Sequence, residues 1–386
     1  MTPILSAEAR AVRDEDAFDV PALARWLREN AGPGWSARLA GRPEVEQFSG
    51  GASNLTYLLR YPGGAELILR RPPAGTKAEG AHDMAREYRI QSALHPVFPL
   101  APATVALCED PAVLGGPFYV MERVAGPIPR KELPRQTPRD PASVAALCRR
   151  VIDLLVDLHH VDIEKAGLAD LGKGEGYVGR QVAGWSARYR AARTRNVGSF
   201  ERVMAWLAEN QPADRGAVLI HNDFRFDNIV FDPADPTVPI ALLDWEMATV
   251  GDPLMDLGGA LAYWVQADDG PLFRRFRRQP THVHGMMSRA EVVAYYCERT
   301  GIELTEDQWS FYEVFGLFRL AGICQQIYHR YYHGQTTNPA FRWFGIAVIA
   351  LEWRCRRIIR RTARPARDPR PQRRDCLRRF MSSLRR

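Results

Sequence analysis

A cluster of polar residues near the middle of the chain has the spacing of a phosphoryl-transfer site. Asp223 follows His221 by two positions and precedes Asn228 by five, and Asp244 lies sixteen positions after Asn228. In the catalytic loop of kinases, an Asp at this position accepts the proton of the acceptor hydroxyl, while the later Asn and Asp bind Mg²⁺ through hard oxygen atoms. We therefore predict that Asp223 is the catalytic base and that Asn228 and Asp244 are magnesium ligands.

Three short apolar runs flank this cluster and predict the strands that position it. The runs are residues 217–220, 229–231 and 239–243. They indicate the order strand, loop, strand, turn, strand. A hairpin of the last two strands brings Asn228 and Asp244 to neighbouring strand ends, where both reach one metal ion. The alternative is that these polar residues only satisfy turns, as Asp and Asn often do.

Two strand-like segments near the amino terminus, residues 44–48 and 55–61, predict a cover for a nucleotide. The loop between them is small, flexible and rich in backbone donors that can approach phosphate oxygens. The predicted nucleotide-binding residues of this loop are Ser49, Gly50, Gly51, Ala52, Ser53 and Asn54. An ordinary hairpin with a glycine turn is the alternative, because two adjacent glycines are a weak motif by themselves.

An arginine stands where a kinase normally places a lysine. Residues 65–71 form an apolar strand that ends in two arginines, and the helix-like stretch 81–94 carries Glu87. Kinases pair a strand Lys with a helix Glu, and here Arg70 lies in the Lys register. Arginine keeps the charge, but its planar fork is not interchangeable with an ammonium group. We predict that Arg70 and Glu87 pair at the nucleotide site; a surface ion pair is the alternative.

Five motifs resemble the aminoglycoside phosphotransferase and choline kinase family of small-molecule kinases, and the resemblance extends from about Val45 to about Trp353. The motifs are Phe48-Ser-Gly-Gly-Ala-Ser-Asn-Leu-Thr, Leu69-Arg-Arg-Pro-Pro, Arg86-Glu87-Tyr, His221-Asn-Asp223 and Gly251-Asp-Pro-Leu-Met-Asp256-Leu. They look most like the branch found fused to acyl-CoA dehydrogenases in animals and free-standing in bacteria. The resemblance implies an α+β, bilobal protein-kinase-like fold with a small β-rich N-lobe and a larger, mainly helical C-lobe. It also implies ATP and Mg²⁺ as cofactors.

The resemblance implies roles for four more residues. The end of the strand predicted at 117–124 is the family's hinge for adenine, which implies nucleotide contacts at Glu122 and Val124. Asp256 would orient the catalytic loop, although capping of the helix that begins there explains an Asp equally well. His221 is interpreted as structural support for the loop, because Asp223 already occupies the position of the base.

The acceptor is predicted to be a small molecule. Only twelve positions separate Asp244 from Asp256, and the long activation segment and A-P-E element of protein kinases are missing. The resemblance implies a hydroxyacyl-CoA ahead of an aminoglycoside or an amino alcohol. Arg180, Arg188 and Arg190 lie on a predicted helix and would suit an anionic carrier, but a solvated basic face explains them equally well.

A catalytically silent module that binds a nucleotide or acyl-CoA is a second hypothesis for the whole chain. The arginine in the lysine register favours it. The presence of Asp223, Asn228 and Asp244 together favours a working enzyme, because a silent fold has no chemical need for all three.

Helix signals dominate the rest of the chain. Asp140 followed by Pro141 predicts a helix start. Capping boxes at Ser288 with Glu291 and at Thr305 with Gln308 predict helices from about residues 289 and 306. The aromatic segment 309–332 indicates a core helix, or alternatively one wall of an acceptor pocket.

Composition and charge complete the prediction. The chain has 386 residues, enough for two packed lobes, and a net charge of +7. Residues 354–386 hold 14 Arg and two Asp, or +12, so that residues 1–353 sum to +7 minus +12, or −5. The basic tail is interpreted as a solvated appendage, with nucleic-acid binding as the rival. The predicted segments are a helical extension (1–43), the nucleotide-covering N-lobe (44–124), the catalytic and acceptor-binding C-lobe (125–353) and a disordered tail (354–386).

No feature of the sequence indicates a membrane or an oxidising compartment. The six cysteines show neither a C-x-x-C pair nor zinc spacing. The amino terminus lacks the apolar segment of a signal peptide. No uncharged apolar stretch reaches the roughly 18 residues that a membrane span needs. We expect a cytoplasmic enzyme without a membrane partner, and the oligomeric state is left open.

Overall fold

A computed structural model describes residues 9–48, 54–73 and 83–362 of the chain. The chain divides into two compact units. The first unit comprises Met1–Gln181 and Ala213–Leu304, and the second comprises Val182–Pro212 and Thr305–Arg386. No helix in the described ranges is long and apolar enough to cross a membrane. The cysteines in those ranges form no disulfide.

A six-stranded antiparallel sheet begins the first unit, with the strand order β1-β2-β3-β4-β6-β5. Its strands are β1 (Ala9–Arg10), β2 (Glu44–Phe48), β3 (Leu55–Arg60), β4 (Glu66–Arg71), β5 (Thr104–Cys108) and β6 (Phe118–Glu122). Five of them lie where the sequence predicts strands, at residues 44–48, 55–61, 65–71, 104–108 and 117–124. The two-residue strand β1 was not predicted, because so short a segment carries no alternation pattern.

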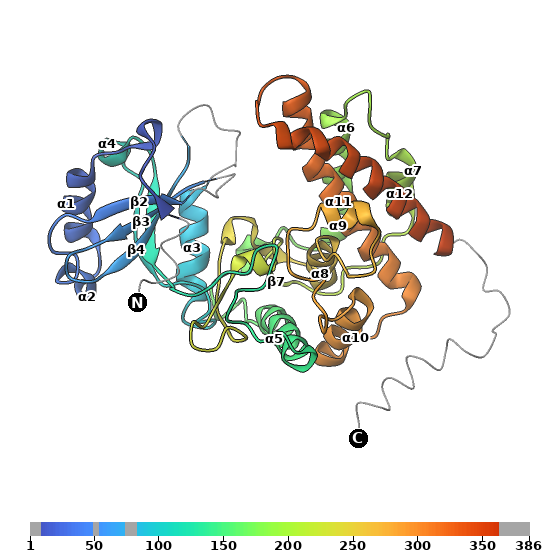
Figure 1. The fold of residues 1–386 in the computed structure, drawn as a ribbon, viewed down its shortest axis with the longest axis horizontal. Helices are drawn as coiled ribbons and strands as arrows, with labels where there is room; N and C mark the ends of the chain where they lie inside the picture. The colour runs from blue at the N-terminus through green and yellow to red at the C-terminus, as the bar shows by residue number, and fades with distance from the viewer. Residues whose placement is uncertain (1–8, 49–53, 74–82, 363–386) are drawn as a thin grey trace. The chain divides into compact units, whose positions relative to one another are not determined.

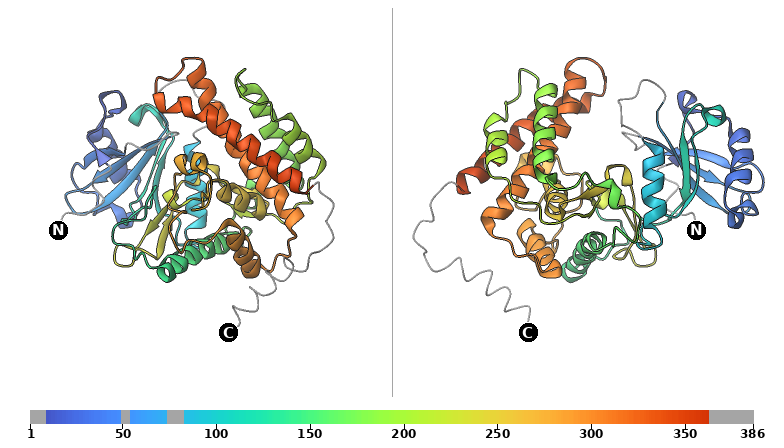
Figure 2. Two further views of the ribbon diagram at one scale, coloured as in Figure 1. Left: turned by 45° about the vertical axis from the view of Figure 1, so that its right-hand side comes forward. Right: turned by 180° about the vertical axis from the view of Figure 1, so that it is seen from behind.

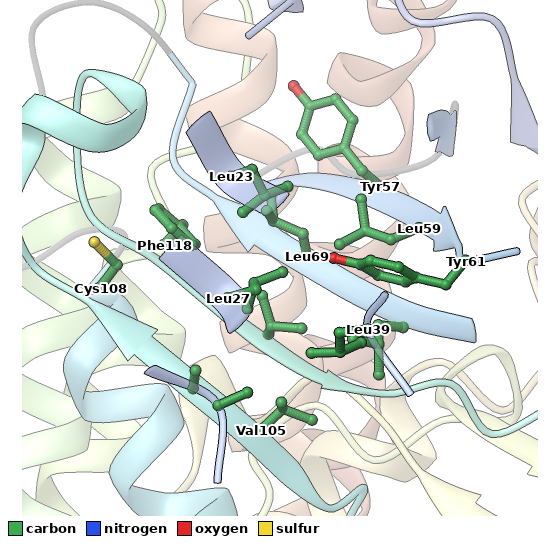
Figure 3. Packing of buried hydrophobic residues seen from close by; sticks show 14 of the residues in the cluster. Leu23, Leu27, Leu39, Tyr57, Leu59, Tyr61, Leu69, Val105, Cys108 and Phe118 are labelled. Carbon is green, nitrogen blue, oxygen red and sulfur yellow. The ribbon is translucent and has the colours of Figure 1, made fainter. Parts of the chain in front are cut away.

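Helices cover both faces of this sheet (Figure 1). One face is covered by α1 (Val20–Asn30), α2 (Pro33–Ser36) and α4 (Pro111–Leu114), and the other by α3 (Met84–Leu94). Figure 3 shows Leu23 and Leu27 of α1 packed among sheet residues such as Leu59 and Leu69. Helix α1 therefore packs on the same hydrophobic core as the sheet.

The alternation of side chains in β4 determines where Arg70 points. Leu67 and Leu69 belong to the core under α1, whereas Ile68 packs with Met84 of α3. Because successive side chains of a strand point to opposite faces, Arg70 lies on the same face as Ile68. The strand therefore carries Arg70 toward the helix that bears Glu87.

Two small antiparallel ladders follow in the first unit. β8 (Ile229–Phe231) pairs with β9 (Pro239–Leu242), which confirms the predicted hairpin. β7 (Val218–Ile220) pairs instead with β10 (Thr249–Gly251), a strand that the sequence did not predict. β10 contains a single apolar side chain, Val250, so it lacks the apolar run that predicted β7 and β8.

The hairpin of β8 and β9 is hydrogen-bonded to the segment that precedes β5 and to the segment that follows β6. The Phe231 N–H donates to the Pro127 carbonyl over 2.9 Å, and the Leu242 N–H donates to the Leu100 carbonyl over 2.8 Å. A Cβ at Gly126 would lie 2.0 Å from the Phe231 carbonyl oxygen, so only glycine permits this close approach. Both strands of the hairpin are thereby held at a set position beside the sheet.

Four further helices of the first unit are α5 (Pro141–His159), α8 (Pro253–Ala262), α9 (Pro271–Arg275) and α10 (Arg289–Thr300). Two of them, α5 and α10, begin where the sequence predicts a capped helix start. The Asp140 side chain accepts from the Ser143 N–H at the start of α5 over 2.9 Å. Both bonds of the predicted capping box are present at Ser288, before α10. These local signals are confirmed because they need no distant partner.

The second unit is helical. It contains most of α6 (Tyr177–Ala192), together with α7 (Glu201–Glu209), α11 (Glu306–Tyr332) and α12 (Phe344–Thr362). The capping box at Thr305 starts α11, and many of its side chains are buried, as expected of a core helix. α11 and α12 lie side by side (Figures 1 and 2).

The basic tail begins later than predicted. Residues 354–362 continue α12, where Cys355 and Ile358 are buried. Residues 363–386 lie outside the described part of the chain. The fold as a whole combines a small antiparallel sheet with a larger, mainly helical part, which confirms the predicted α+β class.

Candidate active site

The backbone of the loop that contains Asp223 is hydrogen-bonded to one buried carboxylate, that of Asp256. Asp256 Oδ2 accepts from the His221 N–H over 2.8 Å, and its Oδ1 accepts from the Asn222 N–H over 2.8 Å. Asn222 has a φ of 62°, a left-handed conformation that non-glycine residues seldom adopt. The two bonds hold the chain in this turn directly before Asp223.

A different aspartate caps helix α8. Asp252 Oδ1 accepts from the N–H groups of Leu254 and Met255, and its Oδ2 accepts from the Arg215 N–H over 2.7 Å. Asp252 therefore satisfies the first turn of the helix, while Asp256 on the next turn reaches the catalytic loop. Of the two interpretations of Asp256, this geometry supports orientation of the loop.

A histidine and a tyrosine that the sequence did not single out stand behind Asp256. His159 Nε2 lies 3.2 Å from Asp256 Oδ2, and the Tyr296 hydroxyl lies 2.6 Å from His159 Nδ1. Burial opposes the ionisation of Asp256, but the hydrogen bonds from His159 and from the His221 N–H hold its pKa below the usual range of an aspartate. His159 closes α5, and no spacing in the sequence links it to a residue 97 positions away.

Replacement of Asp256 by Asn is expected to destabilise the protein by about 1–3 kcal/mol at pH 7, because an amide leaves buried donors without a carboxylate. The folded pKa of Asp256 is depressed, so its stabilisation is present above the unfolded value of about 3.9 and is lost as the pH falls below it. The difference in free energy of unfolding between wild type and Asp256→Asn should therefore shrink between pH 7 and pH 3. Urea unfolding at both pH values measures it.

The control for this prediction is Asp170→Asn. Asp170 is exposed and pairs with Arg89 at the surface, so the same substitution there should change stability little at either pH. An Asp256→Asn effect that stays the same across the pH range would contradict the assignment.

His221 joins the two halves of the site through its ring. The Asp223 N–H donates to His221 Nδ1 over 3.2 Å, and His221 Nε2 lies 2.9 Å from the Leu243 carbonyl oxygen. The ring thus connects the residue of the base to the residue that precedes Asp244. Burial lowers the pKa of His221, which keeps the imidazole neutral. This geometry supports the structural interpretation of His221.

The predicted base and the predicted metal ligands come together at the end of the β8–β9 hairpin. Asn228 Nδ2 donates to the Asp223 carbonyl over 2.9 Å and to Asp223 Oδ2 over 3.1 Å. The Leu243 N–H donates to the Asn228 carbonyl over 2.8 Å, which places Asp244 next to Asn228. Asp244 has a φ of 71°, so the chain turns sharply where the carboxylate is presented.

Arg70 links β4 to the end of β9, where Asp244 follows. We call β9 together with Asp244 the metal strand. Arg70 Nη1 lies 2.5 Å from Glu87 Oε1, and its Nη2 lies 3.1 Å from Asp244 Oδ1. The side chain of Arg70 is 10% exposed and that of Glu87 is 1% exposed. A surface ion pair is therefore the wrong interpretation of this pair. Arg70 also lies 3.8 Å from Glu246 Oε2, so one guanidinium serves three carboxylates.

Burial and the neighbouring carboxylates shift the pKa of Glu87. Burial raises the pKa of Glu87 to about 7, although Arg70 attracts its charge. The nearby Asp244 and Glu246 act in the same direction as burial, because like charges disfavour ionisation. Tyr119, which accepts from Gln91 Nε2 over 2.8 Å, completes this buried network. Arg70 is therefore the shared cation of three carboxylates, those of Glu87, Asp244 and Glu246.

Three side chains, those of Arg86, Asn222 and Asn54, hold the segment after Asp244 by hydrogen bonds. Arg86 of α3 donates to the carbonyls of Glu246 and Ala248 over 3.0 and 2.5 Å. Asn222 Nδ2 donates to the Met247 carbonyl over 3.1 Å. Asn54 Nδ2 donates to Glu246 Oε2 over 3.0 Å. Arg86 and Glu87 thus position the metal strand together, one through the backbone and one through Arg70.

An arginine inside the catalytic loop was also missed by the sequence reasoning. Arg225 Nε lies 3.5 Å from Asp223 Oδ1 and 3.1 Å from Asp227 Oδ1. Its guanidinium carbon lies 4.9 Å from the ring centroid of Tyr263. The guanidinium of Arg225 thus lies between two carboxylates of the loop, one of them that of Asp223. Its place two residues after Asp223 was the available signal.

The structure describes only some of the residues that are predicted to bind the nucleotide. Ser49, Gly50, Gly51, Ala52 and Ser53 lie outside the described residues. Asn54 is buried and bonds to Glu246. Glu122 ends β6, where its N–H donates to the Ala103 carbonyl over 2.8 Å, and Val124 follows before the turn at Gly126.

The donor set suits magnesium. Mg²⁺ prefers oxygen ligands and is usually held by one or two protein groups together with phosphates and water. The Asp244 carboxylate and the Asn228 amide oxygen provide two such groups, from residues at neighbouring ends of the β8–β9 hairpin. The contact of Arg70 with Asp244 Oδ1 shows that this oxygen already attracts a cation.

A family model described as the phosphotransferase enzyme family matches residues 44–291 of the chain. The match covers strands β2 to β6 of the large sheet, together with the loop 221–228 and Asp244.

A curated mouse protein, acyl-CoA dehydrogenase family member 10, is 36% identical over 337 residues, which cover 87% of this chain and 31% of the relative. A chicken protein named acyl-CoA dehydrogenase family member 11 is 36% identical over 346 residues, which cover 88% of this chain and 43% of the relative. The chain spans less than half the length of these curated relatives.

Solved structures share the fold. A provisionally named aminoglycoside phosphotransferase from Ralstonia eutropha matches with a TM-score of 0.74 and 30% identity, covering 89% of this chain and 99% of that chain. A choline kinase from Cryptosporidium parvum matches with a TM-score of 0.58 and 12% identity, covering 89% and 98%. The second likeness concerns the fold alone, and both confirm the predicted kinase-like architecture.

Proposed function

Because the chain belongs to the phosphotransferase enzyme family, we propose that it is an ATP- and Mg²⁺-dependent kinase that phosphorylates a hydroxyl group of a small metabolite, a hydroxyacyl-CoA. The observation that carries the proposal is the convergence of three side chains. Asp223 bonds to Asn228, and Asn228 lies beside the strand end that presents Asp244. A base and two oxygen ligands on neighbouring segments are the parts that phosphoryl transfer requires.

Asp223 acts as the base in the proposed reaction. Its carboxylate aligns the acceptor hydroxyl and takes the proton as the hydroxyl oxygen bonds to the γ-phosphorus of ATP, and ADP leaves with the electrons of the broken P–O bond. Arg225 forms an ion pair with this carboxylate, with its Nε 3.5 Å from Asp223 Oδ1. The Asn228 amide, donating to Asp223 Oδ2, holds the carboxylate in one orientation.

Asn228 and Asp244 would hold Mg²⁺, which supplies charge neutralisation for the phosphates of ATP. Arg70 adds a second positive charge next to them and fixes the direction of Asp244. We assign the loop 49–54 to the phosphates, and Glu122 and Val124 to the adenine. Asp256 and His221 serve as positioning residues for the loop and the metal strand.

The acceptor assignment rests on relatives. The curated relatives that match are named acyl-CoA dehydrogenases, so a substrate on the same acyl carrier is the simplest proposal for this chain. An aminoglycoside or an amino alcohol is the alternative acceptor. A silent binding module is the alternative function, and the Arg in the Lys register is its best support. The buried bond of Arg70 to Glu87 weakens that support, because Arg70 forms the pair that the lysine normally forms.

A transfer assay tests the function. The full chain is incubated with Mg²⁺, γ-labelled ATP and, separately, hydroxyacyl-CoAs of several chain lengths, aminoglycosides and amino alcohols. Label is expected on a hydroxyacyl-CoA, and its transfer should stop when EDTA removes the metal. Transfer to an aminoglycoside alone would replace the proposed acceptor class. Nucleotide binding without transfer to any acceptor would favour the silent module.

A further inference from the structure

The three arginines of α6 that the sequence offered for an anionic carrier each contact other protein groups. Arg180 donates to two backbone carbonyls that precede the helix. Arg190 pairs with Glu201 over 2.7 Å. The guanidinium carbon of Arg188 lies 4.5 Å from the ring centroid of Trp185. A different set of cations, in the first unit, lies closer along the chain to groups that bond to the catalytic loop.

Two segments of the first unit are strongly basic. Residues 130–139, which follow β6, hold four cations and one carboxylate. Residues 271–282, which contain α9, hold four cations and no carboxylate, so that the two segments together carry +7. Residues 1–353 sum to −5, and the rest of that range therefore holds −5 minus +7, or −12. The positive charge of this range is thus concentrated in two short segments.

Glu132 joins the two basic segments. One of its carboxylate oxygens pairs with Arg277, and the other lies 3.9 Å from His282 Nε2. Within the first segment, Arg139 Nη2 donates to the Leu133 carbonyl over 3.2 Å. The one carboxylate that the two segments contain is therefore already bound to the second segment.

Four further cations surround this contact. Each of them is exposed and forms no ion pair within the described part of the chain. They are Lys131, Arg135, Arg274 and Arg278, which we call the basic patch. Lys131 and Arg278 directly adjoin Glu132 and Arg277, so the contact of the two segments brings them close together. Like charges held close to one another favour the binding of an anion.

Both segments are anchored near the catalytic loop. Gln279, the next residue after the patch, is 1% exposed and accepts from the Phe226 N–H over 2.8 Å. Phe226 follows Asp223 by three positions. The chain that leads into the first segment is held beside the same loop, since the Pro127 carbonyl accepts from the Phe231 N–H of β8 over 2.9 Å. The basic patch therefore lies on the same unit as Asp223 and close to its loop.

We propose that the basic patch binds the phosphate groups of a small ligand whose other end reaches Asp223. Naming that ligand as the phosphoryl acceptor rests on the function proposed above. Coenzyme A thioesters have this form, because a flexible arm separates their acyl group from a diphosphate and a further phosphate. Arginine and lysine both bind phosphate. The patch then favours an anionic acceptor and disfavours cationic acceptors such as aminoglycosides and amino alcohols.

A first test compares coenzyme A, dephospho-coenzyme A and pantetheine on the wild-type chain. Their dissociation constants are measured by calorimetry with Mg²⁺ and a nonhydrolysable ATP analogue at saturation, so that none of them binds as a nucleotide. Pantetheine, which lacks all the phosphates, should bind at least about tenfold more weakly than coenzyme A, and dephospho-coenzyme A should lie between the two. Equal affinities for coenzyme A and pantetheine, or no binding of coenzyme A, would overturn the proposal.

A second test removes two charges of the basic patch. Lys131→Gln combined with Arg278→Gln should weaken coenzyme A binding by about tenfold, the product of two exposed charge contacts of about threefold each. Binding of pantetheine and of the ATP analogue should be unchanged, because neither uses the patch.

Arg10→Gln combined with Arg25→Gln is the matched control. Both arginines are exposed and form no ion pair in the described ranges, and the strand order places β1, with Arg10, at the opposite edge of the sheet from β5 and β6. This variant removes the same amount of charge and should change coenzyme A binding by less than about twofold. Equal losses in the two double variants would replace the patch by a general effect of net charge.

Two further measurements separate the rival ligands and the two proposals. Kanamycin binding should not weaken in the Lys131→Gln, Arg278→Gln variant. A short single-stranded oligonucleotide that binds through these two residues more tightly than coenzyme A would assign the patch to nucleic acid and overturn the proposal. If phosphoryl transfer fails while patch-dependent binding of coenzyme A persists, only the proposed function falls. If transfer to a hydroxyacyl-CoA persists with an unchanged KM in the double variant, only this inference falls.

Discussion

Asp223→Asn is expected to lower kcat for phosphoryl transfer by about 10²- to 10⁴-fold while the affinity for MgATP stays the same. The amide is nearly isosteric with the carboxylate but cannot accept the hydroxyl proton, and a positioned base contributes about that factor. The bond from Asn228 to Asp223 can be retained by the amide oxygen, so the loop should keep its shape. Single-turnover rates at saturating ATP, together with nucleotide binding by calorimetry, measure the two quantities separately.

Asp227→Asn is the control for this prediction. Asp223 and Asp227 both contact Arg225, at 3.5 and 3.1 Å from its Nε. Both substitutions therefore remove one carboxylate from the same arginine, but only Asp223 occupies the position of the base. Asp227→Asn should cost less than about tenfold in kcat. Equal losses in the two variants would mean that pairing with Arg225, rather than proton transfer, explains the effect.

Arg70→Met is expected to have the largest effect on stability, about 3–5 kcal/mol. Removing one partner of a buried ion pair leaves the other charge without compensation. Here Glu87, Asp244 and Glu246 would all lose their shared cation. Chemical denaturation with the metal-free protein measures the loss.

The origin of this loss can be checked within the same network. The double variant Arg70→Met with Glu87→Met should recover part of the stability, since burying two apolar side chains replaces an uncompensated charge. Mg²⁺ with an ATP analogue should also restore part of it through binding to the folded state. Failure of both to restore any stability would show that Arg70 acts by packing alone.

Arg60→Met is the matched control at the surface of the sheet. Arg60 also lies between two glutamates, Glu46 and Glu66, but its side chain is 28% exposed. Solvent screens such pairs, and the substitution should cost about 1 kcal/mol or less. A loss equal to that of Arg70→Met would contradict the importance of burial.

The strands around the site were predicted well because their signals are local. The apolar runs on either side of Asn228 mark β8 and β9, and the turn between them needs no distant residue. Capping residues placed α5, α10 and α11 in the same way, since each cap bonds to an N–H two or three positions along the chain. β1 and β10 were not predicted, because neither contains an apolar run of the kind that marks β7, β8 and β9.

Contacts between distant segments could not be read from spacing. Asp256 bonds to the N–H of His221 across 35 positions, and Arg70 reaches Asp244 across 174. Nothing in the sequence indicated that His159 stands behind Asp256, or that Arg86 holds the carbonyls after Asp244. These partners meet only because the β8–β9 hairpin, α3 and α8 pack together.

The types of the reactive groups and their order along the chain were legible without coordinates, because a catalytic loop brings its base and its first metal ligand together within a few residues. The burial of these groups and the balance of charge around them could not be predicted from the sequence. The sequence was equally compatible with Arg70 at the surface, and only the packing of β4 against α3 shows that it is buried. Arg180, Arg188 and Arg190 were indistinguishable in the sequence, whereas in the fold Arg190 pairs with Glu201 and Arg188 stacks on Trp185. The physical reason is that electrostatic environment depends on which groups lie nearby in space, and local patterns along a chain contain no record of that.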